Sequence, residues 1–471
     1  MPPFSAPRLG PGAVHCEALD ALFRAHPDLI RVAEIEPSSG WIKAPGPRGA
    51  VRSNGFALEE AFNLPQAKLV HGIGWPIGGT VCPDGGAWAE QRRWAERLDA
   101  PWTSEHLSFN DSPAGPAGFL LPPAQTQAGV AVATANIRAR TEALGRPFAF
   151  ETGVNYLPPR PGEMPDGDFF AAVAEEADCL ILLDLHNLWA NARNGRDPVE
   201  RVLAALPFDR VIELHLAGGM EKDGYWLDAH SGPVPPGLLD LARDLVAALP
   251  NVGAVLFEIS PQFVDALGPA AFLREMEAMN DLWERTGHRA VASRPWVAPP
   301  RAAADDSPSA YEQALVALLT GPASPGEPPA IALYRTLIAS FRNGALSDLL
   351  PNTLRLLARR LGEAALEEML AAYRLAAPPS LFPSDEALAF AAWLDANGPR
   401  LDYLEDLLEL EAGIVRFAGE GAGGELRFRH DPSAVLDALA AGSVPEGLPK
   451  GDYRLVLHAD AMATASEPAA A

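Results

Sequence analysis

The chain has 471 residues, 48 % of them hydrophobic and 21 % charged, which is the composition of a folded protein with enough apolar surface for large cores. Its 37 Lys and Arg stand against 61 Asp and Glu, and the net charge of 37 − 61 = −24 disfavours nucleic acid as a partner because like charges repel. No apolar run approaches the roughly 18 residues that a membrane-spanning helix needs, and the first residues lack the basic-then-apolar order of a secretion signal, so we expect a cytoplasmic protein without a membrane partner.

Up to about residue 290, short apolar runs alternate with longer segments of helical period, the pattern of strand–helix units around a parallel sheet. We predict eight strands, at residues 12–15, 30–37, 68–74, 101–109, 147–153, 179–187, 210–218 and 254–260. The helices predicted between them cover residues 16–26, 86–100, 126–145, 168–178, 197–207 and 236–250. Eight such units close into a barrel, so we predict an α/β fold with a (β/α)8 TIM-type barrel at residues 1–290.

The remaining residues form a different kind of domain. Residues 291–310 are rich in Pro and Ala and lack an apolar period, which predicts a linker. Residues 311–471 are mainly helical in pattern and end in a short β-containing part. The helices are predicted at 314–321, 331–350, 353–375, 386–398 and 400–413, and the strands at 425–430 and 453–459. This second domain carries no convincing set of catalytic side chains.

Most of the predicted barrel strands end on residue types that bind metals. These residues are Glu34, Glu36, His71, Glu105, His106, Glu151, Asp184, His186, His215 and Glu258. The carboxyl ends of barrel strands meet at one rim, so side chains far apart in sequence are expected to share a pocket. Asp228 and His230, in the loop after the seventh strand, can point the same way only if the backbone bends, and otherwise could serve two neighbouring ions.

His, carboxylate and amide side chains without sulfur suit iron, manganese or zinc better than copper(I) or an iron–sulfur cluster. At least eight candidate ligands exceed the roughly six that one ion takes, which favours two or three ions.

Other conspicuous residues have ordinary explanations. We interpret His15, His26, His288, His430 and His458 as surface or packing residues. Trp102, Trp189 and Trp226 are placed near the rim, where they could stack on a substrate, although core packing is favoured. Cys16, Cys82 and Cys179 show no CxxC spacing, which indicates free thiols. The Gly-rich segments 72–79 and 218–219 match no nucleotide-binding motif and are predicted to be tight loops.

Several motifs together resemble those of a known family. They are HGIG at 71–74, SEHLSF at 104–109, Glu151 at a strand end, LLDLHNLWANARNG at 182–195, ELHLAGG at 213–219, LDAH at 227–230 and FEIS at 257–260. In this order they resemble the multinuclear non-haem iron-dependent oxidative enzymes, which include the methanobactin-biosynthesis oxygenase. The resemblance covers roughly residues 10–285.

The resemblance implies a barrel that holds two or three irons of mixed Fe(II)/Fe(III) valence and uses dioxygen to modify a residue, commonly Cys, in a ribosomally made precursor peptide. The iron ligands that it implies are His71, His106, Glu151, Asp184, Asn187, His215, Asp228, His230 and Glu258. It implies no single residue as the catalytic one.

This chain departs from the family pattern at three places. Thr152 and His186 stand where family members usually carry Asn, and the segment after Glu36 lacks the family's acidic and Asn-containing pattern. The second domain is similar to the helical partner proteins of such enzymes, which implies that it holds the peptide. A structural or dimerising role for this domain is the alternative.

Two other functions use the same residues. A zinc or manganese barrel could act as an isomerase or a hydrolase, similar to xylose isomerase or to an endonuclease, although the charge of −24 disfavours the endonuclease. A metal-loaded scaffold without enzymatic activity, whose helical domain binds a partner, is the third hypothesis.

Overall fold

The computed structural model describes residues 4–44, 51–53, 59, 61–82, 85–287 and 307–458. Contacts divide the chain into two compact units. The first contains residues 1–39, 57–113 and 120–314, and the second contains residues 40–56, 114–119 and 315–471. His288 and most of the predicted linker at 291–310 lie outside the described residues. The domain boundaries at residues 290 and 311 therefore stay a prediction.

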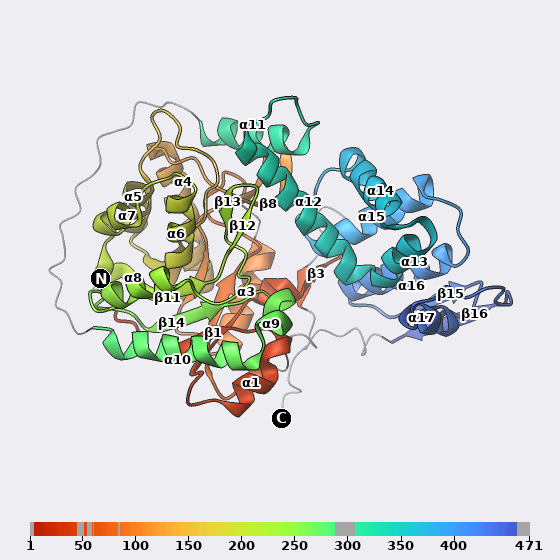
Figure 1. Ribbon diagram of the computed structural model, residues 1–471, viewed down its shortest axis with the longest axis horizontal. Helices are drawn as coiled ribbons and strands as arrows, with labels where there is room; N and C mark the ends of the chain where they lie inside the picture. Colours follow the sequence, from red (N-terminus) through yellow and green to blue (C-terminus); the bar gives the residue numbers. More distant parts are fainter. Residues whose placement is uncertain are drawn as a thin grey trace. The chain divides into compact units, whose positions relative to one another are not determined.

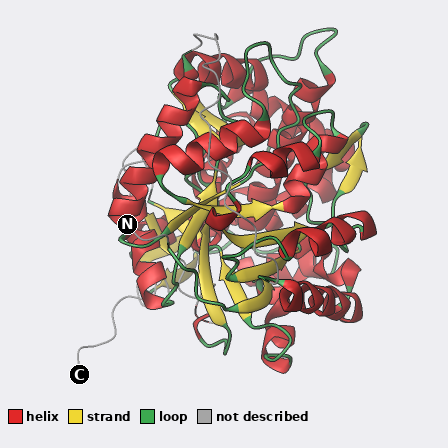
Figure 2. Ribbon diagram, turned by 90° about the vertical axis from the view of Figure 1, so that its left-hand side faces the viewer, coloured by secondary structure: helices red, strands yellow, loops and turns green. Residues whose placement is uncertain are grey.

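The first unit is built on a closed barrel of eight parallel strands, seen among its surrounding helices in Figure 1 and Figure 2. The strands are β1 (Gly10–Val14), β2 (Val32–Ile35), β5 (Ala67–Gly72), β6 (Thr103–His106), β9 (Phe148–Glu151), β10 (Leu180–Asp184), β11 (Val211–Ala217) and β14 (Ala254–Glu258). Around the barrel their order is β1-β14-β11-β10-β9-β6-β5-β2. The predicted fold class and all eight predicted strands are confirmed.

Helices follow the strands and cover the barrel. They are α1 (Asp20–Ala25), α3 (Gly85–Arg97), α4 (Gln127–Leu144), α5 (Asp166–Ala177), α6 (Leu185–Arg193), α7 (Val199–Ala205), α8 (Pro236–Val246), α9 (Pro261–Leu267) and α10 (Pro269–Arg285). The longest of these, α4, has local start and stop signals. The Thr126 hydroxyl accepts a hydrogen bond from the Gly129 N–H, and Gly145 ends the helix at a φ of 63°.

The sequence-based elements were wrong at several places. The predicted strand at 179–187 ends at Asp184, because this carboxylate accepts a hydrogen bond from the Asn187 N–H and caps the start of α6. Helices α6, α9 and α10 were not predicted, and neither were three hairpins. The hairpins are β3 (Trp41–Lys43) with β4 (Val51–Ser53), β7 (Phe109–Ser112) with β8 (Gly115–Leu121), and β12 (Met220–Lys222) with β13 (Tyr225–Leu227).

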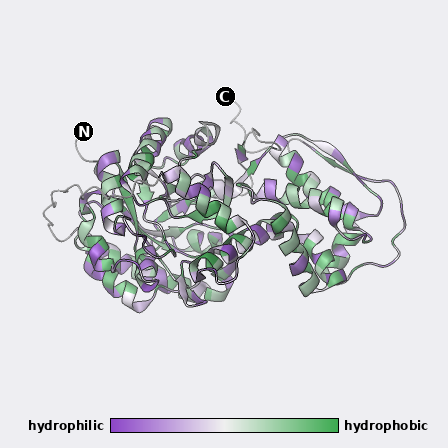
Figure 3. Cartoon of the chain, turned by 90° about the horizontal axis from the view of Figure 1, so that it is seen from above, coloured by the Kyte–Doolittle hydropathy of each residue, from purple (hydrophilic) through white to green (hydrophobic). Residues whose placement is uncertain are grey.

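The interior of the barrel is sealed by apolar residues at the beginning of its strands. This cluster includes Val32, Leu69, Ala149, Leu182, Ile212 and Leu256, and all six are at most 1 % exposed. Trp102 belongs to the same cluster. The expectation that Trp102 lies near the rim was therefore wrong, because it precedes β6 and packs at the opposite end of the barrel. The strand–helix interface forms a second and larger core, and hydrophobic and hydrophilic residues alternate along the helices as their buried faces require (Figure 3).

The second unit is mainly helical. Helix α11 (Pro308–Thr320) contains the boundary between the units and leads to α12 (Pro329–Leu349), α13 (Pro351–Leu361), α14 (Glu363–Ala376), α15 (Pro383–Asn397), α16 (Leu404–Glu420) and α17 (Pro432–Ala440). The segment predicted as one helix at 353–375 is broken at Gly362, whose φ of 88° is left-handed. The two strands predicted near the end of the chain are β15 (Gly424–Phe428) and β16 (Tyr453–Leu457), and they pair antiparallel. Among the described helices, none is both long and apolar enough to cross a membrane.

Candidate metal centre

The ends of the barrel strands bring seven of the nine predicted ligands into three overlapping groups. Within each group, three ligand atoms all lie within 4.8 Å of one another. The first group is His71, His106 and Glu151; the second is Glu151, Asp184 and His215; the third is Asp184, His230 and Glu258. Glu34, Glu213 and His215 meet the same criterion, but only His215 among them is a predicted ligand. Glu151 and Asp184 each belong to two groups, so the groups form a continuous row. The described residues of the second unit contain no such group.

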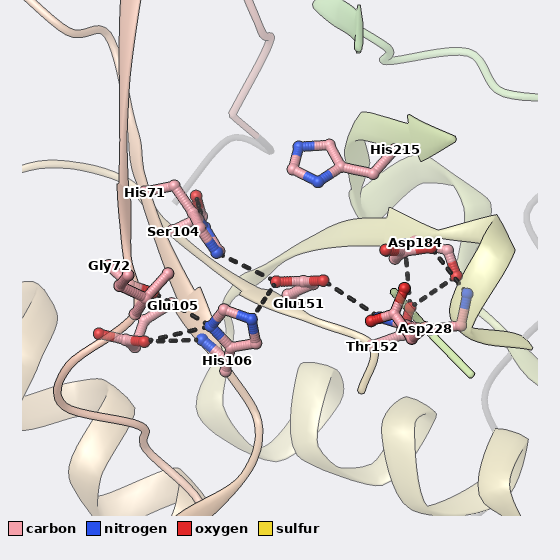
Figure 4. A network of polar contacts seen from close by, with 12 residues as sticks. His71, Gly72, Ser104, Glu105, His106, Glu151, Thr152, Asp184, His215 and Asp228 are labelled. Atoms are coloured by element: carbon pink, nitrogen blue, oxygen red, sulfur yellow. Dashed lines mark hydrogen bonds and ion pairs between the residues drawn. The ribbon is translucent and has the colours of Figure 1, made fainter. Parts of the chain in front are cut away.

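The first group has the geometry of a metal site (Figure 4). The Nε2 atoms of His71 and His106 each lie 3.1 Å from the same oxygen of Glu151. The Nδ1 atom of His106 lies 3.2 Å from the carbonyl oxygen of Gly72, and a carbonyl only accepts hydrogen bonds. Nδ1 of His106 therefore carries the proton, and in the neutral ring Nε2 offers its lone pair toward Glu151.

These distances match the spacing of ligands around one ion. Bonds of about 2.0–2.2 Å that meet at about 90–110° place neighbouring ligand atoms roughly 3 Å apart. The Nδ1 atom of His71 lies 2.8 Å from the Ser104 hydroxyl, which fixes the orientation of this ring too. Both rings are thus held by contacts on the side away from Glu151.

Glu258 joins the second and third groups. One of its oxygens lies 3.0 Å from Nδ1 of His215, and the other lies 3.2 Å from Nε2 of His230. Asn187, an eighth predicted ligand, donates a hydrogen bond of 3.3 Å from its amide nitrogen to Glu151. Its amide oxygen is buried and has no hydrogen-bond partner among the described atoms, so it remains available as a ligand.

Asp228, the ninth predicted ligand, meets His230 through a bent backbone. His230 has a left-handed φ of 46°, and its Nε2 lies 2.9 Å from the carboxylate of Asp228. Residues two apart also share a side in an extended chain, and at the observed bend both side chains keep a common target. Of the two arrangements that the sequence left open, the shared direction is the one observed.

His186 holds Asp228 from the other side. Its Nδ1 lies 2.9 Å from the same carboxylate oxygen, and its Nε2 accepts a hydrogen bond of 3.1 Å from the indole N–H of Trp226. Because the indole nitrogen only donates, Nε2 is unprotonated and Nδ1 carries the proton. His186 is thus a histidine of defined tautomer that orients a predicted ligand.

A layer of buried polar residues lies beside His215, with one residue on its own strand β11 and one on β2 across the barrel. The Nε2 atom of His215 lies 3.1 Å from Glu34 and 3.7 Å from Glu213, and all three residues are fully buried. Glu213 also accepts a hydrogen bond of 2.8 Å from the indole of Trp102. Glu213 was not predicted as a site residue. It stands two residues before His215 in the same strand, and residues at that spacing face the same side of a sheet.

The electrostatics of the row favour cations. Burial raises the pKa of the Asp184 carboxyl well above its ordinary value, and nearby carboxylates, first that of Glu258, raise it further. Burial and the charge of Glu213 raise the pKa of the Glu34 carboxyl to about 8. Two ligand atoms are buried without a hydrogen-bond partner among the described atoms, namely one oxygen of Asp184 and the amide oxygen of Asn187. Unpartnered buried groups of this kind are costly, and a bound metal ion would satisfy them.

The other candidates lie outside the three groups. Glu105 points away from the barrel interior and lies 3.8 Å from buried Arg140, because neighbouring strand residues face opposite sides. His430 is buried and its Nδ1 lies 2.6 Å from Asp406 in the second unit. The three cysteines are free, and burial raises the pKa of the Cys179 thiol to about 12.

The match to a known family covers the barrel, which also contains the candidate site. Residues 31–282 match the family model described as "RiPP precursor modification enzyme MbnB/TglH/ChrH". A protein of Streptomyces avermitilis named UPF0276 is 35 % identical over 279 residues, which cover 56 % of this chain and 55 % of that protein. A UPF0276 protein of Chromobacterium violaceum is also 35 % identical, over 47 % of this chain and 80 % of that protein.

Solved structures give a weaker likeness. The structure of D-psicose 3-epimerase with D-tagatose from Clostridium cellulolyticum is similar over 59 % of this chain and 99 % of its own, with a TM-score of 0.37 and 11 % identity. A xylose isomerase domain protein from Alicyclobacillus acidocaldarius is similar over 58 % of this chain and all of its own, with a TM-score of 0.36 and 15 % identity. Similarity at this level carries no argument about the reaction.

Proposed function

This chain belongs to the family of RiPP precursor modification enzymes MbnB/TglH/ChrH, and we propose that it uses iron and dioxygen to oxidise a cysteine of a ribosomally made precursor peptide. This oxidoreductase would act in the cytoplasm, in the biosynthesis of a peptide natural product. The observation that carries the proposal is the row of three ligand groups with shared carboxylates.

The donor set fits iron. Imidazole, carboxylate and one amide oxygen are ligands of non-haem iron, and none of the nine residues supplies sulfur. Three groups joined by Glu151, Asp184 and Glu258 support three ions rather than one, since carboxylates bridge neighbouring metals through their two oxygens. Bound iron of mixed valence would supply dioxygen activation and electron transfer from the peptide.

The residues of the chain itself have three tasks. The Gly72 carbonyl and the Ser104 hydroxyl hold the rings of His106 and His71, so that these ligands need no reorganisation when a metal binds. His186 orients Asp228 in the same way. The apolar cluster at the other end of the barrel closes the interior to water from that side.

We assign the peptide-holding role to residues 311–471. The support is their similarity to the family's partner proteins, together with their fusion to the barrel. A fused recognition domain raises the local concentration of bound peptide at the catalytic unit to about the millimolar range if its linker is short and flexible.

The experiment is to purify the protein without oxygen and to determine its metals by elemental analysis and Mössbauer spectroscopy. The wild type should contain two or more irons per chain, and H215A and D228A should each contain fewer than the wild type. Addition of oxygen to the iron-loaded protein and its precursor peptide should change the mass of a Cys-containing fragment. Full occupancy by zinc or manganese, with unchanged peptide, would instead support the isomerase or hydrolase.

A further inference from the structure

A cavity of about 250 Å³ lies next to the third ligand group. It is bounded by the ends of β1 and β2 and by the segment after β14, and His230 and Glu258 form part of its wall. Its volume is below the roughly 300–1,000 Å³ of pockets for drug-sized ligands. The cavity therefore suits one amino-acid side chain with its adjoining backbone.

His15 lines this cavity and is held in one orientation. Its Nε2 lies 2.5 Å from the carboxylate of Asp20, and its ring packs edge-to-face on Phe23 with centroids 5.3 Å apart. Its backbone N–H donates to the Glu34 carbonyl, which fixes the residue at the end of β1. With Nε2 engaged by Asp20, Nδ1 is the nitrogen that remains for a molecule in the cavity.

A histidine with a carboxylate on one ring nitrogen and an open second nitrogen is the arrangement of a proton acceptor. The carboxylate orients the ring and stabilises the imidazolium that forms. The other ionisable groups that line the cavity are Cys16, Glu17 and Glu36, with His230 and Glu258 on the metal side.

We propose that this cavity receives the residue that is modified, and that His15, oriented by Asp20, accepts the proton which that residue loses. The inference rests on the proposed function and adds the substrate subsite and its base. A cysteine binds a metal as the thiolate. Its S–H bond breaks, the proton forms an N–H bond at Nδ1 of His15, and the electron pair stays on sulfur beside the ion of the third group.

The test measures how many protons are released when a thiol binds, and it does not require the oxidation reaction. Protein loaded with Co²⁺ is titrated with N-acetylcysteine amide, and binding is detected by the sulfur-to-cobalt absorption band. The band must be absent before the amide is added, because Cys16 could otherwise supply it. Calorimetry in buffers of different ionisation enthalpy then gives the number of protons released per thiol bound. H26Q is the matched control, since His26 ends α1 outside the cavity.

At pH 7, where a free thiol is almost fully protonated, the wild type and H26Q should release close to no protons, and H15Q should release about one per thiol. D20N, which keeps the imidazole but loses the charge that orients it, should fall between them. Cobalt content and thermal melting must match the wild type, so that a misfolded variant is recognised.

Equal proton release from the wild type, H15Q and D20N would overturn the role of His15. Absence of the band in all proteins would overturn the subsite. Neither result depends on iron or dioxygen, so failure of this inference and failure of the proposed oxidation are separate outcomes.

Discussion

The shared position of Glu151 makes a quantitative prediction about metal content. Glu151 belongs to the first and second ligand groups, whereas His106 belongs to the first alone. If the three groups of predicted ligands each hold one ion, the wild type binds three ions, H106A binds two and E151A binds one. The exposed Glu142 on α4 offers a matched control, and E142A should bind three.

The number of bound ions also predicts how much the metal stabilises the wild type and each variant. An ion that binds only the folded state adds about 2.7 kcal/mol when its free concentration is 100 times its dissociation constant. At such a concentration H106A should lose about 2.7 kcal/mol of metal-dependent stability, and E151A should lose about twice as much. Both losses should vanish when the metal is removed from all proteins, apart from the effect of the substitution on the apoprotein.

The assay is elemental analysis of anaerobically reconstituted protein, combined with denaturant unfolding in the presence and absence of metal. Size-exclusion chromatography and circular dichroism establish that each variant is folded. The reasoning is refuted if E151A retains as many ions as H106A, because Glu151 would then serve one site. Loss of every ion from H106A would also contradict it, since the third group shares no residue with the first.

Two further predictions concern residues outside the ligand groups. H186A should weaken metal binding about 10–100-fold in a chelator competition, because Asp228 loses the Nδ1–H that orients it; unchanged affinity would show that this contact is incidental. R196A should cost about 3–5 kcal/mol in denaturant unfolding, because Arg196 and Asp166 are paired and buried and the carboxylate would be left alone. R201A, which removes a largely exposed ion pair, should cost less than about 1 kcal/mol, and an equal loss in both variants would refute the argument.

The barrel was predictable because its signals are local. Each strand is a short apolar run, and the regular return of such runs between helical segments determines a parallel barrel. The same logic predicted that His71, Glu151 and Glu258 would meet, since all three stand at the carboxyl ends of strands. Topology alone brings these positions to one rim, so their convergence follows without knowledge of any contact.

The features of the site that the sequence did not predict all depend on the local path of the backbone. Glu105 and His106 are neighbours in one strand and face opposite sides, but which of them faces the interior depends on how β6 is placed in the barrel. Asp228 and His230 meet in a loop whose backbone is left-handed at His230, a conformation that no residue pattern predicts. The early start of α6 depends on Asp184, a predicted ligand whose carboxylate also caps the helix.

The sequence by itself determined the fold class, the strand positions and the residue types gathered at the rim, because hydrophobic periodicity and strand order are written along the chain. Only the tertiary structure decided which carboxylates are shared, which ring nitrogen of His106 or His186 faces its partner, and that His15 joins Asp20 beside a cavity. These features depend on distances of about 3 Å between side chains from different strands, and such distances follow from register, tilt and loop conformation rather than from the local pattern of residues.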